Sequence, residues 1–170
     1  MLTLIIGGAG SGKSAFAERL VENLSGQRFY LATMEAEDEE SMARIRRHRS
    51  LREDRAFTTI ELGHGLEKLE VPQEANLLLE DLSNLLANEI YGLEGGGAEA
   101  VRRGLEHLYF SCTHLTIVTN EVFSGGIEYG EEILSYLKKL ADLNRGLAAQ
   151  ADLVVEVVCG LPNVLKGKLP

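Results

Sequence analysis

Short apolar runs alternate along the chain with longer segments in which apolar residues recur at helical spacing. The runs predict five strands and the periodic segments predict five helices. Because strands that alternate with helices build a mostly parallel sheet with helices on both faces, the pattern indicates the α/β class. The predicted strands are Leu2 to Ile6, Phe29 to Ala32, Asn76 to Leu79, Leu115 to Thr119 and Leu153 to Val158, and the predicted helices are Lys13 to Leu24, Glu39 to about Leu51, Leu82 to Tyr91, Ala98 to Tyr109 and Gly130 to Ala149.

The carboxyl ends of parallel strands meet at one edge of the sheet, where ligands of such folds collect. We therefore expect the glycine-rich run after the first strand, the Thr33 region, Glu80 and Asn120 to lie together at that edge.

Length and composition narrow the class of protein. With 170 residues, 45% of them hydrophobic, the chain suits one globular domain spanning residues 1–170. A formal net charge of -9 argues against general binding to nucleic acid or anionic membranes and favours small-molecule chemistry.

Cys112 and Cys159 form no metal-binding or disulfide pattern. No apolar run approaches the roughly 20 residues of a membrane span, and the start lacks a signal peptide, so we expect a cytoplasmic protein.

A phosphate-binding loop is predicted between the first strand and the first helix. Glycines allow successive backbone N–H groups to point at phosphate oxygens, and the helix N-terminus favours negative charge. Lys13 is expected to reach the β- and γ-phosphates, and the Ser14 hydroxyl group to bind a Mg²⁺ ion. The loop comprises Gly7, Gly8, Ala9, Gly10, Ser11, Gly12, Lys13 and Ser14.

Loops of this kind require a carboxylate near the metal, usually at the end of a neighbouring apolar strand. Glu80 and Asp81 follow Leu77 to Leu79 and are the candidates. Adjacent residues on an extended chain point to opposite sides, so the sequence leaves open which one faces the metal. Asp81 has a second interpretation, as the N-cap of the helix that begins at Leu82.

Residues 44–55 contain six arginines in a chain that is acidic overall. On a helix Arg44, His48 and Arg52 share one face and could bind a polyanion such as a triphosphate. Neighbouring cations disfavour the protonated imidazole, so His48 would keep a nucleophilic nitrogen. From spacing alone, a solvated basic helix face that happens to carry a histidine is the favoured interpretation of the segment.

Several segments together resemble the bifunctional adenosylcobinamide kinase/adenosylcobinamide-phosphate guanylyltransferase family over almost the whole chain. Besides the phosphate loop, they are Tyr30-Leu31-Ala32-Thr33, Ala43-Arg44-Ile45 followed by His48-Arg49, Leu78-Leu79-Glu80, Val118-Thr119-Asn120-Glu121-Val122 and Gly160-Leu161-Pro162 with Leu165-Lys166.

The resemblance implies two reactions of cobalamin biosynthesis and salvage. ATP or GTP phosphorylates the terminal hydroxyl group of the aminopropanol arm of adenosylcobinamide. A histidine, His48 by position, then takes GMP from GTP and passes it to the adenosylcobinamide phosphate. Catalytic roles fall to His48 and Lys13, and metal binding to Ser14, Glu80 and Asp81. Beyond the loop, the implied nucleotide contacts are Thr33, Met34, Glu35, Arg49, Ser50, Leu51, Arg52, Glu61 and Glu80.

The resemblance also implies a P-loop fold of the RecA-like type and a homotrimer. The chain departs from the family at Gly10, where arginine is usual, at Glu53, at Phe57 and over Phe123 to Tyr129. Two other functions remain open. One is a P-loop small-molecule kinase without guanylyl transfer, and the other is a nucleotide-binding regulatory protein without catalysis.

Overall fold

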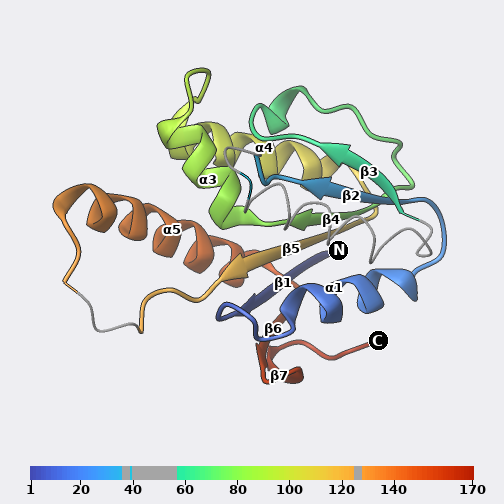
Figure 1. Ribbon diagram of the computed structural model, residues 1–170. Helices are drawn as coiled ribbons and strands as arrows, with labels where there is room; N and C mark the ends of the chain where they lie inside the picture. The colour runs from blue at the N-terminus through green and yellow to red at the C-terminus, as the bar shows by residue number, and fades with distance from the viewer. Residues whose placement is uncertain (36–38, 40–56, 125–127) are drawn as a thin grey trace.

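The computed structural model describes residues 1–35, 39, 57–124 and 128–170. Its centre is a seven-stranded sheet with the strand order β3-β2-β4-β5-β1-β6-β7 (Figure 1). Neighbouring strands are parallel except for the β6–β7 hairpin, which is antiparallel. The strands are β1 (Leu2–Gly7), β2 (Arg28–Ala32), β3 (Thr58–Glu61), β4 (Asn76–Glu80), β5 (His114–Asn120), β6 (Leu153–Val158) and β7 (Leu161–Lys166).

Helices cover both faces of this sheet. Helix α1 packs its Ala17 and Val21 against one face, with Val118 of β5 in the same cluster. Helices α3, α4 and α5 pack against the other face, where Leu85 and Leu147 join Ile117 of β5. Successive strand residues thus alternate between two apolar layers, which explains the continuous apolar runs. The predicted α/β P-loop fold is confirmed. The described helices are α1 (Lys13–Glu22), η1 (Leu66–Lys68), α3 (Leu82–Tyr91), α4 (Gly97–Ser111) and α5 (Glu131–Gln150).

The structure adds two strands that the apolar pattern did not predict. Strand β3 carries a single apolar residue, Ile60, and β7 is exposed at every position and contains Pro162. Both lie at the ends of the strand order, and edge strands need neither a buried run nor a full set of backbone donors. The predicted helix from Glu39 to about Leu51 lies, apart from Glu39, outside the described residues.

The strand register brings the expected groups to the carboxyl edge of the sheet. Gly7 of β1 pairs with Asn120 of β5, and Ala32 of β2 pairs with Glu80 of β4. The predicted meeting of the glycine loop, the Thr33 region, Glu80 and Asn120 is therefore confirmed. Within the described ranges, no helix is both long and apolar enough to cross a bilayer.

Candidate functional site

The phosphate loop connects β1 to α1 as the sequence predicts. Gly10 and Gly12 have φ angles of 70° and 89°, which lie in the left-handed region that glycine adopts at low cost. The N-cap residue of α1 is Gly12, which has no side chain to accept a hydrogen bond from the first backbone N–H groups of the helix. Lys13 is buried, and its Nζ donates a hydrogen bond of 3.3 Å to the Gly8 carbonyl. The loop therefore combines backbone donors and a positive charge at one place.

The turn between β6 and β7 packs against this loop and is hydrogen-bonded to it. The Gly160 N–H donates to the Ser11 carbonyl oxygen at 2.7 Å. A Cβ atom on Gly12 would lie 3.1 Å from Gly160 Cα, and one on Gly7 would lie 2.7 Å from the Val157 carbonyl oxygen. Glycine thus permits the close packing of loop against turn. Gly160-Leu161-Pro162 is one of the segments that resemble the family, but no local pattern indicates a role for this turn.

Glu80 is the carboxylate that meets the loop. The Ser14 hydroxyl group donates to Glu80 Oε1 at 2.6 Å. Glu80 Oε2 is buried and has no hydrogen-bond partner in the described part of the chain. Burial, and then the charge of Asp81, raises the pKa of Glu80 from 4.5 to about 8. Glu80 Oε2 thus has no hydrogen-bond donor among the described residues. An oxygen in this situation is suited to bind a cation.

Asp81 is held by two different groups. Its Oδ1 accepts from the Asn84 N–H at 2.8 Å, so the N-cap interpretation is confirmed. Its Oδ2 accepts from Asn120 Nδ2 at 3.0 Å. Burial raises the pKa of Asp81. Of the two acidic candidates, Glu80 is the one that contacts Ser14.

Thr33, the residue after β2, is hydrogen-bonded to the backbone of the acidic pair, Glu80 and Asp81. Its N–H donates to the Glu80 carbonyl oxygen at 3.1 Å. Its hydroxyl group, fully buried, donates to the Asp81 carbonyl oxygen and accepts from the Asp81 N–H, both at 2.8 Å. Asn88 of α3 in turn fixes the backbone at Thr33, because its Nδ2 donates to the Thr33 and Gly63 carbonyl oxygens at 2.8 and 3.0 Å. No local pattern in the sequence points to Asn88, because its role depends on this contact between distant segments.

The other predicted nucleotide contacts follow β2 and β3. Met34 is half-buried, whereas Glu35 and Glu61 are exposed. Glu35 Oε1 lies 3.7 Å from His64 Nδ1, and His64 Nε2 lies 3.1 Å from Glu94 Oε2. His64 therefore stands between two carboxylates. His48, Arg49, Ser50, Leu51 and Arg52 lie outside the described residues, so their roles stay predictions.

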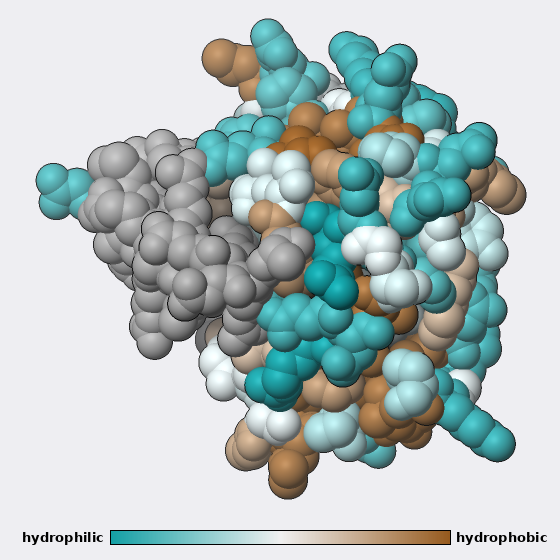
Figure 2. Space-filling view, turned by 90° about the vertical axis from the view of Figure 1, so that its right-hand side faces the viewer, coloured by the Kyte–Doolittle hydropathy of each residue, from teal (hydrophilic) through white to brown (hydrophobic). Residues whose placement is uncertain are grey.

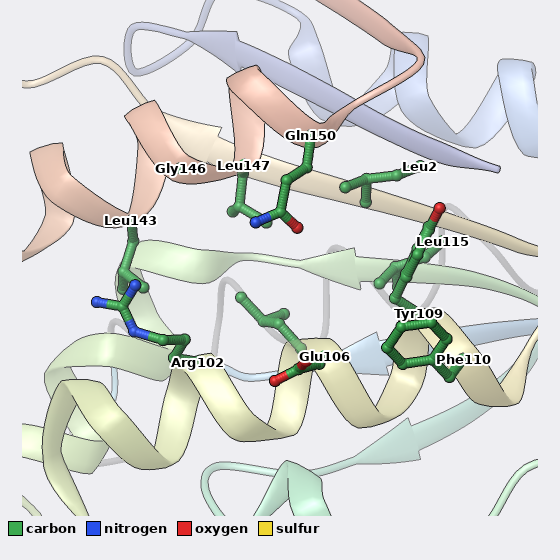
Figure 3. Close-up of a pocket in the computed structure, with 11 residues that line it drawn as sticks. Leu2, Arg102, Glu106, Tyr109, Phe110, Leu115, Leu143, Gly146, Leu147 and Gln150 are labelled. Atoms are coloured by element: carbon green, nitrogen blue, oxygen red, sulfur yellow. The ribbon is translucent and has the colours of Figure 1, made fainter.

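A separate hollow of about 200 Å³ lies at the opposite edge of the sheet, where the strands begin (Figure 3). Leu2 and Leu115 form its floor between the ends of α4 and α5, and the exposed Phe110 stands at its rim. Figure 2 looks onto this side of the molecule, where apolar and polar side chains alternate over the surface. None of the predicted site residues lines this hollow.

Comparison with known proteins agrees with the geometry. A family model described as "Cobinamide kinase / cobinamide phosphate guanyltransferase" matches residues 3–165. The "Bifunctional adenosylcobalamin biosynthesis protein CobP" of Pseudomonas aeruginosa is 34% identical over 174 residues, with 99% of each chain covered. The proteins named "Bifunctional adenosylcobalamin biosynthesis protein CobU" of Escherichia coli and Salmonella typhimurium are each 29% identical over 183 residues, covering 98% of this chain and 100% of theirs. The chain therefore belongs to the cobinamide kinase / cobinamide phosphate guanyltransferase family.

Proposed function

We propose that this protein phosphorylates the terminal hydroxyl group of the aminopropanol arm of adenosylcobinamide and then transfers GMP from GTP to the new phosphate group. The observation that carries the proposal is the contact of 2.6 Å between Ser14 Oγ and Glu80 Oε1 beside the buried Lys13. It brings together the hydroxyl group, the carboxylate and the cation that a magnesium nucleotide requires. The family assignment supports the choice of substrates.

The loop would bind the triphosphate of ATP or GTP. Backbone N–H groups and the N-terminus of α1 favour negative charge there. The Lys13 ammonium group is already held at the loop by the 3.3 Å hydrogen bond to Gly8, which is long enough for a phosphate oxygen to compete with it. Lys13 would thus stabilise the charge that develops on the transferred phosphoryl group.

The same residues fit a Mg²⁺ ion. Magnesium prefers oxygen ligands and usually keeps several from water and phosphate. Ser14 and Glu80 offer oxygens 2.6 Å apart, and the unpartnered Glu80 Oε2 suits a cation. Asp81 would act from behind Glu80, because both of its oxygens already accept hydrogen bonds. The bound ion would neutralise phosphate charge during transfer.

The guanylyl transfer would use His48 as nucleophile. A ring nitrogen of His48 forms a bond to the α-phosphorus of GTP while the bond to the bridging oxygen breaks and pyrophosphate leaves. A phosphate oxygen of adenosylcobinamide phosphate then attacks the same phosphorus, and the phosphorus–nitrogen bond breaks. The cationic stretch from Arg49 to Arg52 would offset the phosphate charge. Support for this step is the family assignment and the arginine-rich segment around His48.

Labelling with GTP that carries ³²P at the α-phosphate tests the proposal. The protein is incubated with Mg²⁺ and the label, denatured, and examined by gel and mass spectrometry. We expect acid-labile protein-bound GMP in the wild type, its loss in His48→Ala, and its retention in His107→Ala, which alters an exposed histidine of α4.

A labelled His48→Ala protein would refute the nucleophile assignment. A wild type that phosphorylates cobinamide without labelling would indicate a simple kinase, and GTP binding without either reaction would indicate a regulatory protein. The implied homotrimer is a further part of the proposal, and light scattering after size-exclusion chromatography would measure it.

A further inference from the structure

Asn120 occupies a central place in the sheet. It ends β5, and β5 lies between β1, which leads into the phosphate loop, and β4, which leads into the acidic pair. It pairs in register with Gly7, the first residue of the loop. The next residue, Glu121, donates its N–H to the Gly7 carbonyl oxygen at 2.9 Å. The backbone around Asn120 is therefore fixed to the loop.

Two acceptors fix the orientation of the Asn120 carboxamide group. Its Nδ2 donates to Asp81 Oδ2 at 3.0 Å and to Ser83 Oγ at 3.1 Å. The NH₂ group therefore faces Asp81 and Ser83, and the carbonyl oxygen points away from these two partners. The Oδ1 atom is then the free end of the group, and it makes no hydrogen bond to any residue that the structure describes.

Strand alternation assigns Asn120 to the face of the sheet that carries the phosphate loop, while its NH₂ group reaches Asp81 and Ser83 at the start of α3. Side chains alternate between faces along a strand. Val118, two residues before Asn120, lies in the apolar cluster of α1, as does Leu78, two residues before Glu80. Asn120 and Glu80 therefore extend toward the same side, where Glu80 meets Ser14. Asn120 is half-buried, so part of it stays accessible.

We infer that Asn120 is a substrate-orienting residue of the phosphoryl transfer, and that its Oδ1 accepts a hydrogen bond from the hydroxyl group that attacks the γ-phosphate. The inference rests on the proposed kinase activity. A neutral acceptor suits this place, since a carboxamide oxygen aligns a hydroxyl group without adding negative charge beside the phosphates.

The step is a simple group transfer. The hydroxyl oxygen forms a bond to the γ-phosphorus, while the bond from that phosphorus to the bridging oxygen breaks and the nucleoside diphosphate leaves with the electron pair. The hydroxyl proton passes to an oxygen of the transferred phosphoryl group and from there to solvent, because a carboxamide does not hold a proton at neutral pH. Asn120 thus contributes alignment and not proton transfer.

Asn120→Ala tests the role with a matched control. Asn163→Ala removes a similar hydrogen bond, from Asn163 Nδ2 to Glu156 Oε2 at 3.1 Å, on the exposed strand β7. We expect Asn120→Ala to lower the kcat for cobinamide phosphorylation about 10- to 100-fold. Its KM for the nucleotide and its labelling by α-³²P-GTP should stay within about 3-fold of the wild type, because neither involves the acceptor hydroxyl group. Asn163→Ala should match the wild type in all three.

An unchanged kcat in Asn120→Ala would overturn the inference. So would a parallel loss of GTP binding and labelling, which would make Asn120 a support of the loop alone. If Asn120→Ala does not fold, Asn120→Ser, which keeps a small polar side chain, is held to the same criteria. A wild type that labels with GMP but never phosphorylates cobinamide would overturn the kinase half of the proposed function and this inference together.

Discussion

Glu80 is a carboxylic acid that its surroundings keep largely uncharged at neutral pH. Burial raises its pKa to about 8, although the Ser14 hydrogen bond and the charge of Lys13 act in the opposite direction. A bound cation would reverse this balance, because a nearby positive charge favours the ionised form. Glu80 would thus lose its proton as Mg²⁺ and nucleotide bind.

The raised pKa predicts a pH-dependent stability of the protein without metal or nucleotide. A carboxyl group whose pKa is higher when folded stabilises the fold below its unfolded pKa of 4.5, and this contribution is lost as the pH rises through about 8. Glu80→Gln removes this dependence. Relative to wild type, its free energy of unfolding should therefore increase by roughly 4 kcal/mol between pH 4.5 and pH 9.

Urea denaturation in EDTA at several pH values measures this difference. Glu70→Gln, at an exposed position, should follow the wild type throughout. Equal pH profiles for Glu80→Gln and the wild type would contradict the assignment.

At the scale of elements, Glu89 of α3 joins two loops. Its Oε1 accepts from the Gly65 N–H at 2.8 Å, before η1, and its Oε2 accepts from the Gly96 N–H at 2.7 Å, before α4. The side chain is buried, so both oxygens depend on these donors. Gly104 completes the arrangement, because a Cβ there would lie 2.4 Å from Leu66 Cβ and would separate α4 from η1. The layer formed by α3, α4 and η1 thus depends on one carboxylate and one glycine.

Glu89→Ala should therefore lower the free energy of unfolding by about 3 kcal/mol, because it leaves two backbone donors without their acceptors. Glu94→Ala is the matched control. The Glu94 side chain is 80% exposed and contacts only His64 among the interactions that the structure describes, so its loss should cost less than about 0.5 kcal/mol. Chemical denaturation compares the two variants, and a similar small loss in both would show that the Glu89 hydrogen bonds contribute little.

At the scale of the whole molecule, most strands of the sheet contribute residues to the site or contact it. The loop follows β1, and Glu80 ends β4 while Asp81 follows it. Thr33 follows β2, Asn120 ends β5, and the β6–β7 turn contacts the loop. A ligand that binds this arrangement binds only the folded state. Its binding free energy should therefore add to the global stability.

Mg²⁺-GTP at 100 times its Kd should stabilise the wild type by about 2.7 kcal/mol, which corresponds to a rise in Tm of roughly 5 to 10 °C for a chain of this size. Lys13→Ala removes the buried cation of the loop and should abolish most of this rise. Lys138→Ala, on the exposed side of α5, should keep it. Thermal denaturation with and without ligand measures this rise in Tm. An equal rise in the Lys13→Ala protein would exclude the loop as the GTP site.

Local patterns in the sequence predicted much of this arrangement. Apolar runs indicated the five inner strands, because a strand buried on both faces must be continuously apolar. The glycine spacing before Lys13 and Ser14 predicted the loop, because its backbone conformation demands glycine at particular positions. The acidic pair after Leu79 was found because it follows such a run directly.

Features that depend on contacts between residues distant in the chain could be seen only in the three-dimensional structure. The edge strands β3 and β7 became visible only through their pairing with β2 and β6. The choice of Glu80 over Asp81 as the partner of Ser14, and the link from Asn120 to Asp81, follow from a strand order that inserts β5 between β4 and β1. A local pattern records which face of an element is apolar, but strand order and register arise from contacts between segments separated by tens of residues, and those contacts leave no periodic signal in either segment.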